Sequence, residues 1–203
     1  MIAVIDYGAG NLQSVVKAFH FIGCDILVTA DKEELKHASA AVLPGVGAFG
    51  DAMSCLKKAD FVTPVLDFIE SGKPFLGICL GLQLLFEGSE ETPGISGLGV
   101  LKGKIQKIPA ETGLKIPHIG WNSLSVKKNN GLFQNMEPNP YVYFVHSYYL
   151  KAEDPEVVTS TADYGVTIDA SVQHGNLFAT QFHPEKSGKT GLQMLKNFVS
   201  VVS

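Results

Sequence analysis

Short apolar runs alternate with stretches of helical periodicity through the first half of the chain. Apolar residues at positions 12, 15, 16, 19 and 22 follow helical spacing, for example, between two such runs. We expect helices at 11–22, 31–37, 51–57, 61–70 and 80–87, and strands at 2–5, 25–28, 40–43 and 74–78. Strands that alternate with helices predict a parallel sheet covered by helices on both faces.

The second half of the chain reads as strands with little helix between them. Strands are expected at 100–108, 119–125, 141–146, 157–162, 167–173 and 176–181, with a tight turn at 174–176 and a closing helix at 188–202. Such a series predicts antiparallel strands and hairpins. No linker, repeat or charge block interrupts the pattern, so we expect a single α/β domain over residues 1–203.

Composition and charge exclude several classes of protein. Hydrophobic residues make up 45% and charged residues 18% of the 203 positions, which excludes a disordered chain. Sixteen lysines, no arginine and a net charge of −4 argue against a nucleic-acid partner. The apolar runs are too short for a membrane span, and the start lacks a secretory signal. Three cysteines at unrelated spacings suggest neither disulfides nor a metal site. We therefore expect a cytoplasmic protein.

The strongest chemical signal is the segment Gly77-Ile78-Cys79-Leu80-Gly81, between an apolar strand and a predicted helix. This is a G-x-C-x-G nucleophile elbow, in which glycines flank a residue held at a sharp turn. A helix N-terminus favours negative charge on the Cys79 sulfur, and the N–H of Leu80 is an expected oxyanion donor. The alternative is a buried structural cysteine, which is how we interpret Cys24 and Cys55.

A thiolate nucleophile needs a base, and His183 has the most informative setting among six histidines. It lies in Gln181-Phe182-His183-Pro184-Glu185, directly after an apolar strand. In extended backbone, His183 and Glu185 project to the same side, so the carboxylate can orient the imidazole. His118 and His146 lie beside aromatic strands and are further candidates for lining a site. Cys79, His183 and Glu185 form the predicted catalytic triad.

Taken in order, the motifs resemble the class I (triad) glutamine amidotransferases over essentially the whole chain. Within that family, the resemblance is to the glutaminase subunits of imidazole glycerol phosphate synthases. The motifs that carry it are DYGAGN at 6–11, PGVG at 44–47, CLGLQLLF at 79–86, HIGWN at 118–122, YFVHSY at 143–148 and QFHPEKS at 181–187. The resemblance implies a flavodoxin-like fold: a central, mostly parallel sheet flanked by helices, with additional antiparallel strands in the C-terminal half.

The same resemblance implies hydrolysis of L-glutamine to glutamate and ammonia, without a cofactor. Cys79 forms a glutamyl thioester, His183 relays protons and Glu185 orients His183. The implied oxyanion donors lie at Leu80 and in the backbone of Val46 and Gly47, where glycines on both sides of Val46 permit a peptide rotation. The implied substrate contacts are Gln83, Glu91 (with Glu90 as a second candidate for the α-amino group), and the backbone of His146, Ser147 and Tyr148.

A partner polypeptide is also implied. In these synthases, ammonia passes into a (β/α)₈ cyclase subunit, which forms imidazole glycerol phosphate and aminoimidazole carboxamide ribonucleotide for histidine biosynthesis. The positions that match the docking face of this heterodimer are Asn11, Trp121, Asn122, Tyr143 and Lys186. The alternative interpretation, which does not use the family resemblance, is that Trp121 is a core residue and Lys186 a solvent-exposed charge.

Three other interpretations stay open. The first is a triad amidotransferase that serves another synthase. The second is a non-catalytic flavodoxin-like binding protein with a redox cysteine, and the third is a cysteine peptidase or esterase. The DYGAGN and HIGWN segments argue against the amidotransferases of pyridoxal phosphate and anthranilate synthesis. The His183-Pro184-Glu185 element argues against a redox protein, and a peptidase or esterase requires an open cleft.

Overall fold

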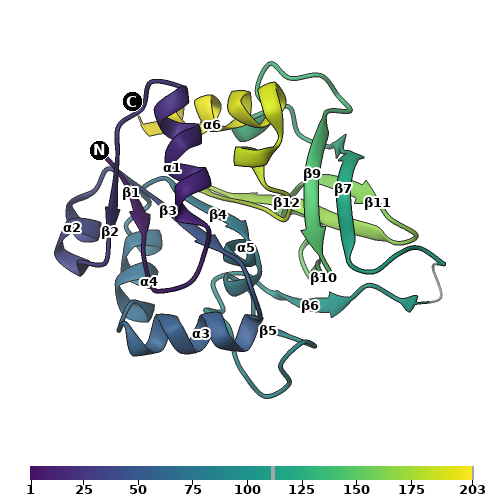
Figure 1. Cartoon of the computed structure of the whole chain (residues 1–203), viewed down its shortest axis with the longest axis horizontal. Coiled ribbons are helices and arrows are strands. Elements are labelled where there is room, and N and C mark those ends of the chain that lie inside the picture. Colours follow the sequence, from purple (N-terminus) through teal and green to yellow (C-terminus); the bar gives the residue numbers. More distant parts are fainter. Residues whose placement is uncertain (111–112, 203) are drawn as a thin grey trace.

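The structure is a computed structural model that describes residues 1–110 and 113–202. Eight strands form a central sheet in the order β2-β1-β3-β4-β13-β12-β11-β8 (Figure 1). The first five strands in this order run parallel, and the remaining neighbours pair antiparallel. This arrangement confirms the expected parallel sheet with antiparallel strands in the C-terminal half.

The elements have the following bounds. The central sheet contains β1 (Ile2–Ile5), β2 (Ile26–Thr29), β3 (Ala40–Gly45), β4 (Phe75–Cys79), β8 (Ser125–Val126), β11 (Val158–Asp163), β12 (Thr167–His174) and β13 (Leu177–Thr180). A three-stranded sheet holds β5 (Gly88–Ser89), β6 (Gly103–Lys107) and β10 (Tyr148–Ala152), and β7 (His118–Ser123) pairs with β9 (Tyr141–His146). The helices are α1 (Leu12–Phe21), α2 (Lys32–His37), α3 (Phe49–Lys58), α4 (Val62–Glu70), α5 (Leu80–Leu84) and α6 (Gly188–Val202).

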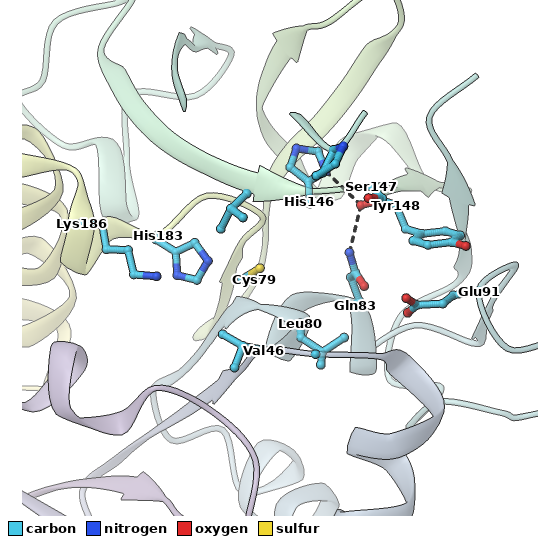
Figure 2. A pocket seen from close by; sticks show the side chains of 13 residues that line it. Val46, Cys79, Leu80, Gln83, Glu91, His146, Ser147, Tyr148, His183 and Lys186 are labelled. Atoms are coloured by element: carbon cyan, nitrogen blue, oxygen red, sulfur yellow. Dashed lines mark hydrogen bonds between the residues drawn. The ribbon is translucent and has the colours of Figure 1, made fainter. Parts of the chain in front are cut away.

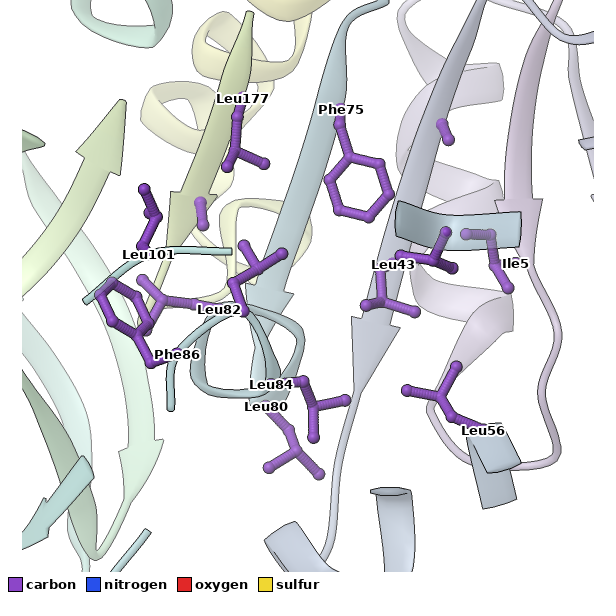
Figure 3. Close-up of a cluster of buried hydrophobic side chains, with 14 of the residues drawn as sticks. Ile5, Leu43, Leu56, Phe75, Leu80, Leu82, Leu84, Phe86, Leu101 and Leu177 are labelled. Carbon is purple, nitrogen blue, oxygen red and sulfur yellow. The ribbon is translucent and has the colours of Figure 1, made fainter. Parts of the chain in front are cut away.

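Both faces of the parallel strands β1, β3, β4 and β13 are buried, and the two-residue period of a strand divides their side chains between two cores. In β1, Ala3 and Ile5 belong to the core that also receives side chains from α2, α3, α4 and α5. Figure 3 shows Ile5 in this core with Leu56 of α3 and Leu82 of α5. Ile2 and Val4 face the opposite core, which contains buried side chains of α1, α6 and β9. This explains why the strands of the first half are continuous apolar runs rather than alternating ones.

Two sequence predictions miss the observed elements near the site. The helix expected at 80–87 ends at Leu84, because the backbone N–H groups of Leu98 and Leu101 bond to the carbonyls of Leu84 and Leu85. The strand β10 was not predicted, because it follows β9 after one residue and no Gly or Pro marks the break. The tight turn is confirmed: His174 pairs with Leu177 across Gly175 and Asn176.

The carboxyl ends of the parallel strands carry the candidate chemistry. Gly45 at the end of β3 pairs with Cys79 at the end of β4, and Thr180 at the end of β13 pairs with Ile78. Ligands of open α/β sheets bind outside the carboxyl ends of the strands. The topology therefore brings the Val46 loop, the Cys79 turn and the segment after Thr180 to one edge of the sheet.

Candidate active site

Cys79 occupies the sharp turn between β4 and α5 that the sequence predicts. Its φ is 56°, a left-handed value that a residue with a side chain adopts at a cost. A Cβ on Gly81 would lie 1.9 Å from the carbonyl oxygen of Leu43, and a Cβ on Gly77 would lie 2.9 Å from the carbonyl oxygen of Gly81. Both glycines are therefore required by close backbone approach, as the elbow interpretation expects.

A cavity of about 410 Å³ opens beside Cys79 (Figure 2). Figure 2 shows Cys79 between His183 and Gln83, with Glu91 beyond Gln83. The sequence-predicted residues that line it are Val46, Gly47, Cys79, Leu80, Gln83, Glu91, His146, Ser147, Tyr148, His183 and Lys186. Segments that are far apart in the chain thus converge on one concave site.

His183 and Glu185 form a buried pair next to the nucleophile. Nδ1 of His183 lies 2.7 Å from Oε1 of Glu185, and each side chain is 2% exposed. Nε2 of His183 has no hydrogen-bond partner, and the ring points toward Cys79 in Figure 2. Burial alone lowers the pKa of His183, but Cys79 and Glu185 outweigh it and raise this pKa to about 9. The site therefore favours the charged form of the His183 imidazole.

The expected extended backbone between His183 and Glu185 is wrong. Glu185 does not continue the extended backbone of His183, because Pro184–Lys186 form a 3₁₀ turn. The carboxylate reaches the imidazole from this turn, which begins at the proline and is fixed by a hydrogen bond from the Ser187 hydroxyl to the carbonyl of His183. The pairing was predicted correctly, and the backbone conformation was not.

Gln181 is a site residue that the sequence interpretation did not assign. Its side chain is fully buried, and its Nε2 lies 3.8 Å from Sγ of Cys79. Its Oε1 accepts a hydrogen bond of 3.0 Å from Nε2 of Gln83, which also donates to the carbonyl of Tyr148 at 3.0 Å. Its place in the same QFHPE segment as His183, directly after β13, was the signal available.

The structure distinguishes the two candidate carboxylates after α5. Oε2 of Glu91 accepts a 2.8 Å hydrogen bond from the backbone N–H of Phe49, the first residue of α3, and Glu91 lines the cavity. Glu90 instead accepts from the backbone N–H of Lys107, outside the cavity. Only Glu91 of the two is therefore placed to meet a ligand there.

The loop from Pro44 to Gly47 borders the cavity opposite His146. Gly47 has a φ of +101° and open space around it, so the backbone conformation selects glycine there. Gly45 has a different reason: a Cβ on it would lie 2.8 Å from the Tyr7 hydroxyl and 2.9 Å from Cβ of Leu80. Of the two glycines that flank Val46, one therefore serves close packing rather than rotation.

The histidines beside the aromatic strands form a second buried pair. Nδ1 of His118 lies 3.0 Å from Nε2 of His146, and Nδ1 of His146 lies 3.0 Å from the carbonyl of Tyr148. Burial lowers the pKa of His118 to about 4 and that of His146 to about 3. Both rings are therefore neutral at pH 7, and neither is arranged as the partner of Cys79.

The predicted docking residues lie on and beside the β7–β9 pair. Trp121 is 56% exposed and meets Tyr143 edge-on at 6.2 Å, so the core interpretation of Trp121 is wrong. Asn11 is exposed at the start of α1, which contacts the 3₁₀ turn that carries Lys186. Asn122 differs from the others because its Nδ2 already donates to the carbonyl of Asp163 at 2.8 Å.

Within residues 1–110 and 113–202, His, Cys, Asp and Glu side chains nowhere gather in a group of three or more that could hold a metal ion. None of the helices described there is long and apolar enough to cross a membrane.

Comparisons with known proteins agree with this geometry. The family model described as Glutamine amidotransferase class-I matches residues 3–202. Curated proteins named "Imidazole glycerol phosphate synthase subunit HisH" are similar along the whole chain: that of Bacillus cereus strain G9842 is 50% identical over 202 residues (100% of this chain, 95% of the relative). That of Syntrophotalea carbinolica is 51% identical over 203 residues, covering 98% of each chain.

Solved structures resemble the chain in fold at low sequence identity. A crystal structure of a glutamine amidotransferase superimposes with a TM-score of 0.77 at 18% identity, covering 100% of this chain and 99% of the other. The structure of PurLQS from Thermotoga maritima gives a TM-score of 0.76 at 21% identity, covering 100% and 98%.

Proposed function

Because the chain belongs to the class-I glutamine amidotransferase family, we propose that it is the glutaminase subunit of an imidazole glycerol phosphate synthase. It hydrolyses L-glutamine and delivers ammonia to a separate cyclase subunit in histidine biosynthesis. The observation that carries the activity is the cavity in which the elbow residue Cys79 faces the buried His183–Glu185 pair. We also assign the protein to the cytoplasm under this proposal.

The first half of the reaction releases ammonia. The Cys79 sulfur attacks the side-chain amide carbon of glutamine, and the carbonyl electrons move onto oxygen. The backbone N–H of Leu80, at the start of α5, and a donor from the Val46–Gly47 peptide stabilise this oxyanion. The C–N bond then breaks, the nitrogen takes the proton from Nε2 of His183, and a glutamyl thioester remains on Cys79.

The second half restores the enzyme. Neutral His183 removes a proton from water, and the resulting hydroxide adds to the thioester carbon. Collapse of that intermediate breaks the C–S bond and releases glutamate, while the sulfur and His183 return to their starting charges. Glu185 keeps its carboxylate on Nδ1 throughout, so that Nε2 faces the reacting atoms in both halves.

The remaining cavity residues suit the amino-acid end of glutamine. The Glu91 carboxylate is placed to receive the α-ammonium group, and the backbone of Ser147 and Tyr148 to receive the α-carboxylate. Gln83 uses both hydrogens of its amide nitrogen within the protein, so its oxygen is the group left to accept from the substrate. These contacts select glutamine over a primary amide that lacks the α-ammonium and α-carboxylate groups.

The docking surface is formed by Asn11, Trp121, Asn122, Tyr143 and Lys186. An exposed tryptophan that meets a tyrosine edge-on is typical of a protein interface, where both residue types are enriched. Because Lys186 also lines the cavity, this surface adjoins the place beside His183 where ammonia is released. Ammonia can then pass to the partner without entering bulk solvent.

Covalent labelling tests the activity. A chloroketone analogue of glutamine should add one label, located on Cys79 by mass spectrometry, and free glutamine should protect against it. Labelling that persists unchanged in Cys79→Ala, or a fully active His183→Asn variant, would refute the assigned triad.

Addition of the cyclase subunit and its nucleotide ligand should raise the rate of glutamine hydrolysis. A cyclase that does not bind would indicate that the chain serves another synthase.

A further inference from the structure

Gln181 links the nucleophile to the substrate side of the cavity through a buried amide pair. It directly follows β13, is fully buried and contacts both Cys79 and Gln83. We propose that Gln181 is a positioning residue that aims the Cys79 sulfur at the substrate carbon and stabilises negative charge on it. This proposal rests on the proposed function and adds a residue to its catalytic apparatus.

The direction of the hydrogen bonds follows from the chemistry of the groups. The carbonyl of Tyr148 is only an acceptor, so the nitrogen of the Gln83 amide must face it. The second hydrogen of that nitrogen then points to Gln181, whose oxygen accepts it at 3.0 Å. With its oxygen committed to Gln83, Gln181 must present its N–H to Sγ of Cys79. The amide cannot be reversed without breaking bonds at both ends.

A neutral donor at this position suits a sulfur that changes charge twice. The N–H stabilises the sulfur while it is negatively charged before attack, and again when it becomes the leaving group of the thioester. Unlike His183, an amide neither gains nor loses a proton near neutral pH, so it stays a donor in both halves of the reaction. The backbone of Cys79 is held at a φ of 56°, and a directed donor from Gln181 restricts the rotamer of its side chain as well.

Two substitutions of similar size separate the donor from the packing role of Gln181. Gln181→Glu keeps an oxygen for Gln83 but replaces the N–H with a carboxylate oxygen that repels a charged sulfur. Gln181→Met fills the space and loses both polar contacts. Gln134→Glu makes the same chemical change at an exposed glutamine and is the matched control.

The experiment measures kcat and KM for glutamine hydrolysis by the complex with the cyclase, and the rate of Cys79 alkylation by iodoacetamide. In Gln181→Glu, kcat should fall about 10- to 100-fold, the usual effect of losing one hydrogen bond to a charged group, while KM stays within about threefold. Gln181→Met should raise KM as well, because Gln83 loses its acceptor. Alkylation should be slower in Gln181→Glu than in Gln181→Met, and unchanged in Gln134→Glu.

A role limited to packing predicts the reverse order, since Met is the larger disturbance of the buried hydrogen bonds. Alkylation slower in Gln181→Met than in Gln181→Glu, or kcat within twofold of the natural chain in both, would overturn the proposal. If Gln181→Glu does not give the natural circular dichroism spectrum, alkylation of Gln181→Met decides: a rate equal to the natural one refutes the donor. Alkylation needs no glutamine, so it judges Gln181 even if the proposed glutaminase activity fails.

Discussion

Replacing Glu185 with glutamine tests how the buried carboxylate controls its histidine. The substitution keeps the shape of the side chain and an oxygen that can accept from Nδ1 of His183, and it removes only the charge. Because Glu185 orients His183 and transfers no proton itself, we expect glutamine hydrolysis to be reduced but not abolished. The sharper expectation concerns the pH dependence of stability.

The size of that effect follows from the pKa of His183. Its value of about 9, against 6.5 for an ordinary histidine, corresponds to about 3 kcal/mol of preference for the charged ring. A raised pKa stabilises the folded chain fully below pH 6.5, and this stabilisation is lost as the pH rises through about 9. Glu185 shares this effect with Cys79, so its removal costs less than about 3 kcal/mol at pH 6. Above pH 9 the natural chain holds a buried carboxylate beside a neutral ring, which removes its advantage over the variant.

Urea unfolding of both chains at pH 6, 7.5, 9 and 10 measures this difference. The natural chain should exceed Glu185→Gln in unfolding free energy most at pH 6, and the excess should shrink toward pH 10. An NMR titration of His183 should show a lower pKa in the variant. The same substitution in a His183→Asn background is the control and should lose the pH dependence. A difference that stays constant from pH 6 to 10 would refute the ion-pair reasoning.

The remaining predictions concern the backbone that carries the site. Tyr7→Phe removes the hydroxyl that donates to the carbonyl of Pro44 at 3.0 Å, and should cost about 0.5–1.5 kcal/mol in urea unfolding with a lower kcat; unchanged values would show that this bond does not hold the oxyanion loop. Gly81→Ala places a Cβ 1.9 Å from a backbone oxygen and should destabilise by about 3 kcal/mol or more, whereas Gly23→Ala, with a φ of +78° and open space, should cost only about 1–2 kcal/mol. Equal melting temperatures for these two variants would contradict the crowding argument.

The sequence predicts those parts of the fold that depend on local pattern. The apolar runs of β1, β3 and β4 and the periodicity of α1 and α6 are each contained in a short window, and each was found within a few residues. The strand β10 was missed because its burial is set by pairing with β6, which lies about 45 positions earlier and leaves no local signal. The same reason explains α5, whose end is fixed by hydrogen bonds from the following loop rather than by a capping residue.

The site divides in the same way. Cys79 and its glycines could be predicted because an elbow requires them within five residues. His183 and Glu185 could be paired because they are near neighbours in one segment, although a 3₁₀ turn rather than extended backbone brings them together. Gln181 contacts Gln83 and Cys79, which lie 98 and 102 positions away from it in the chain. These two hydrogen bonds therefore exist only once β4 and β13 lie side by side. A side-chain amide has no intrinsic direction, and here the Tyr148 carbonyl, from a third segment, determines which end of the Gln181 amide faces the sulfur. The charged groups of the site are thus encoded locally, whereas the polarity of the neutral bonds between them depends on the assembled sheet.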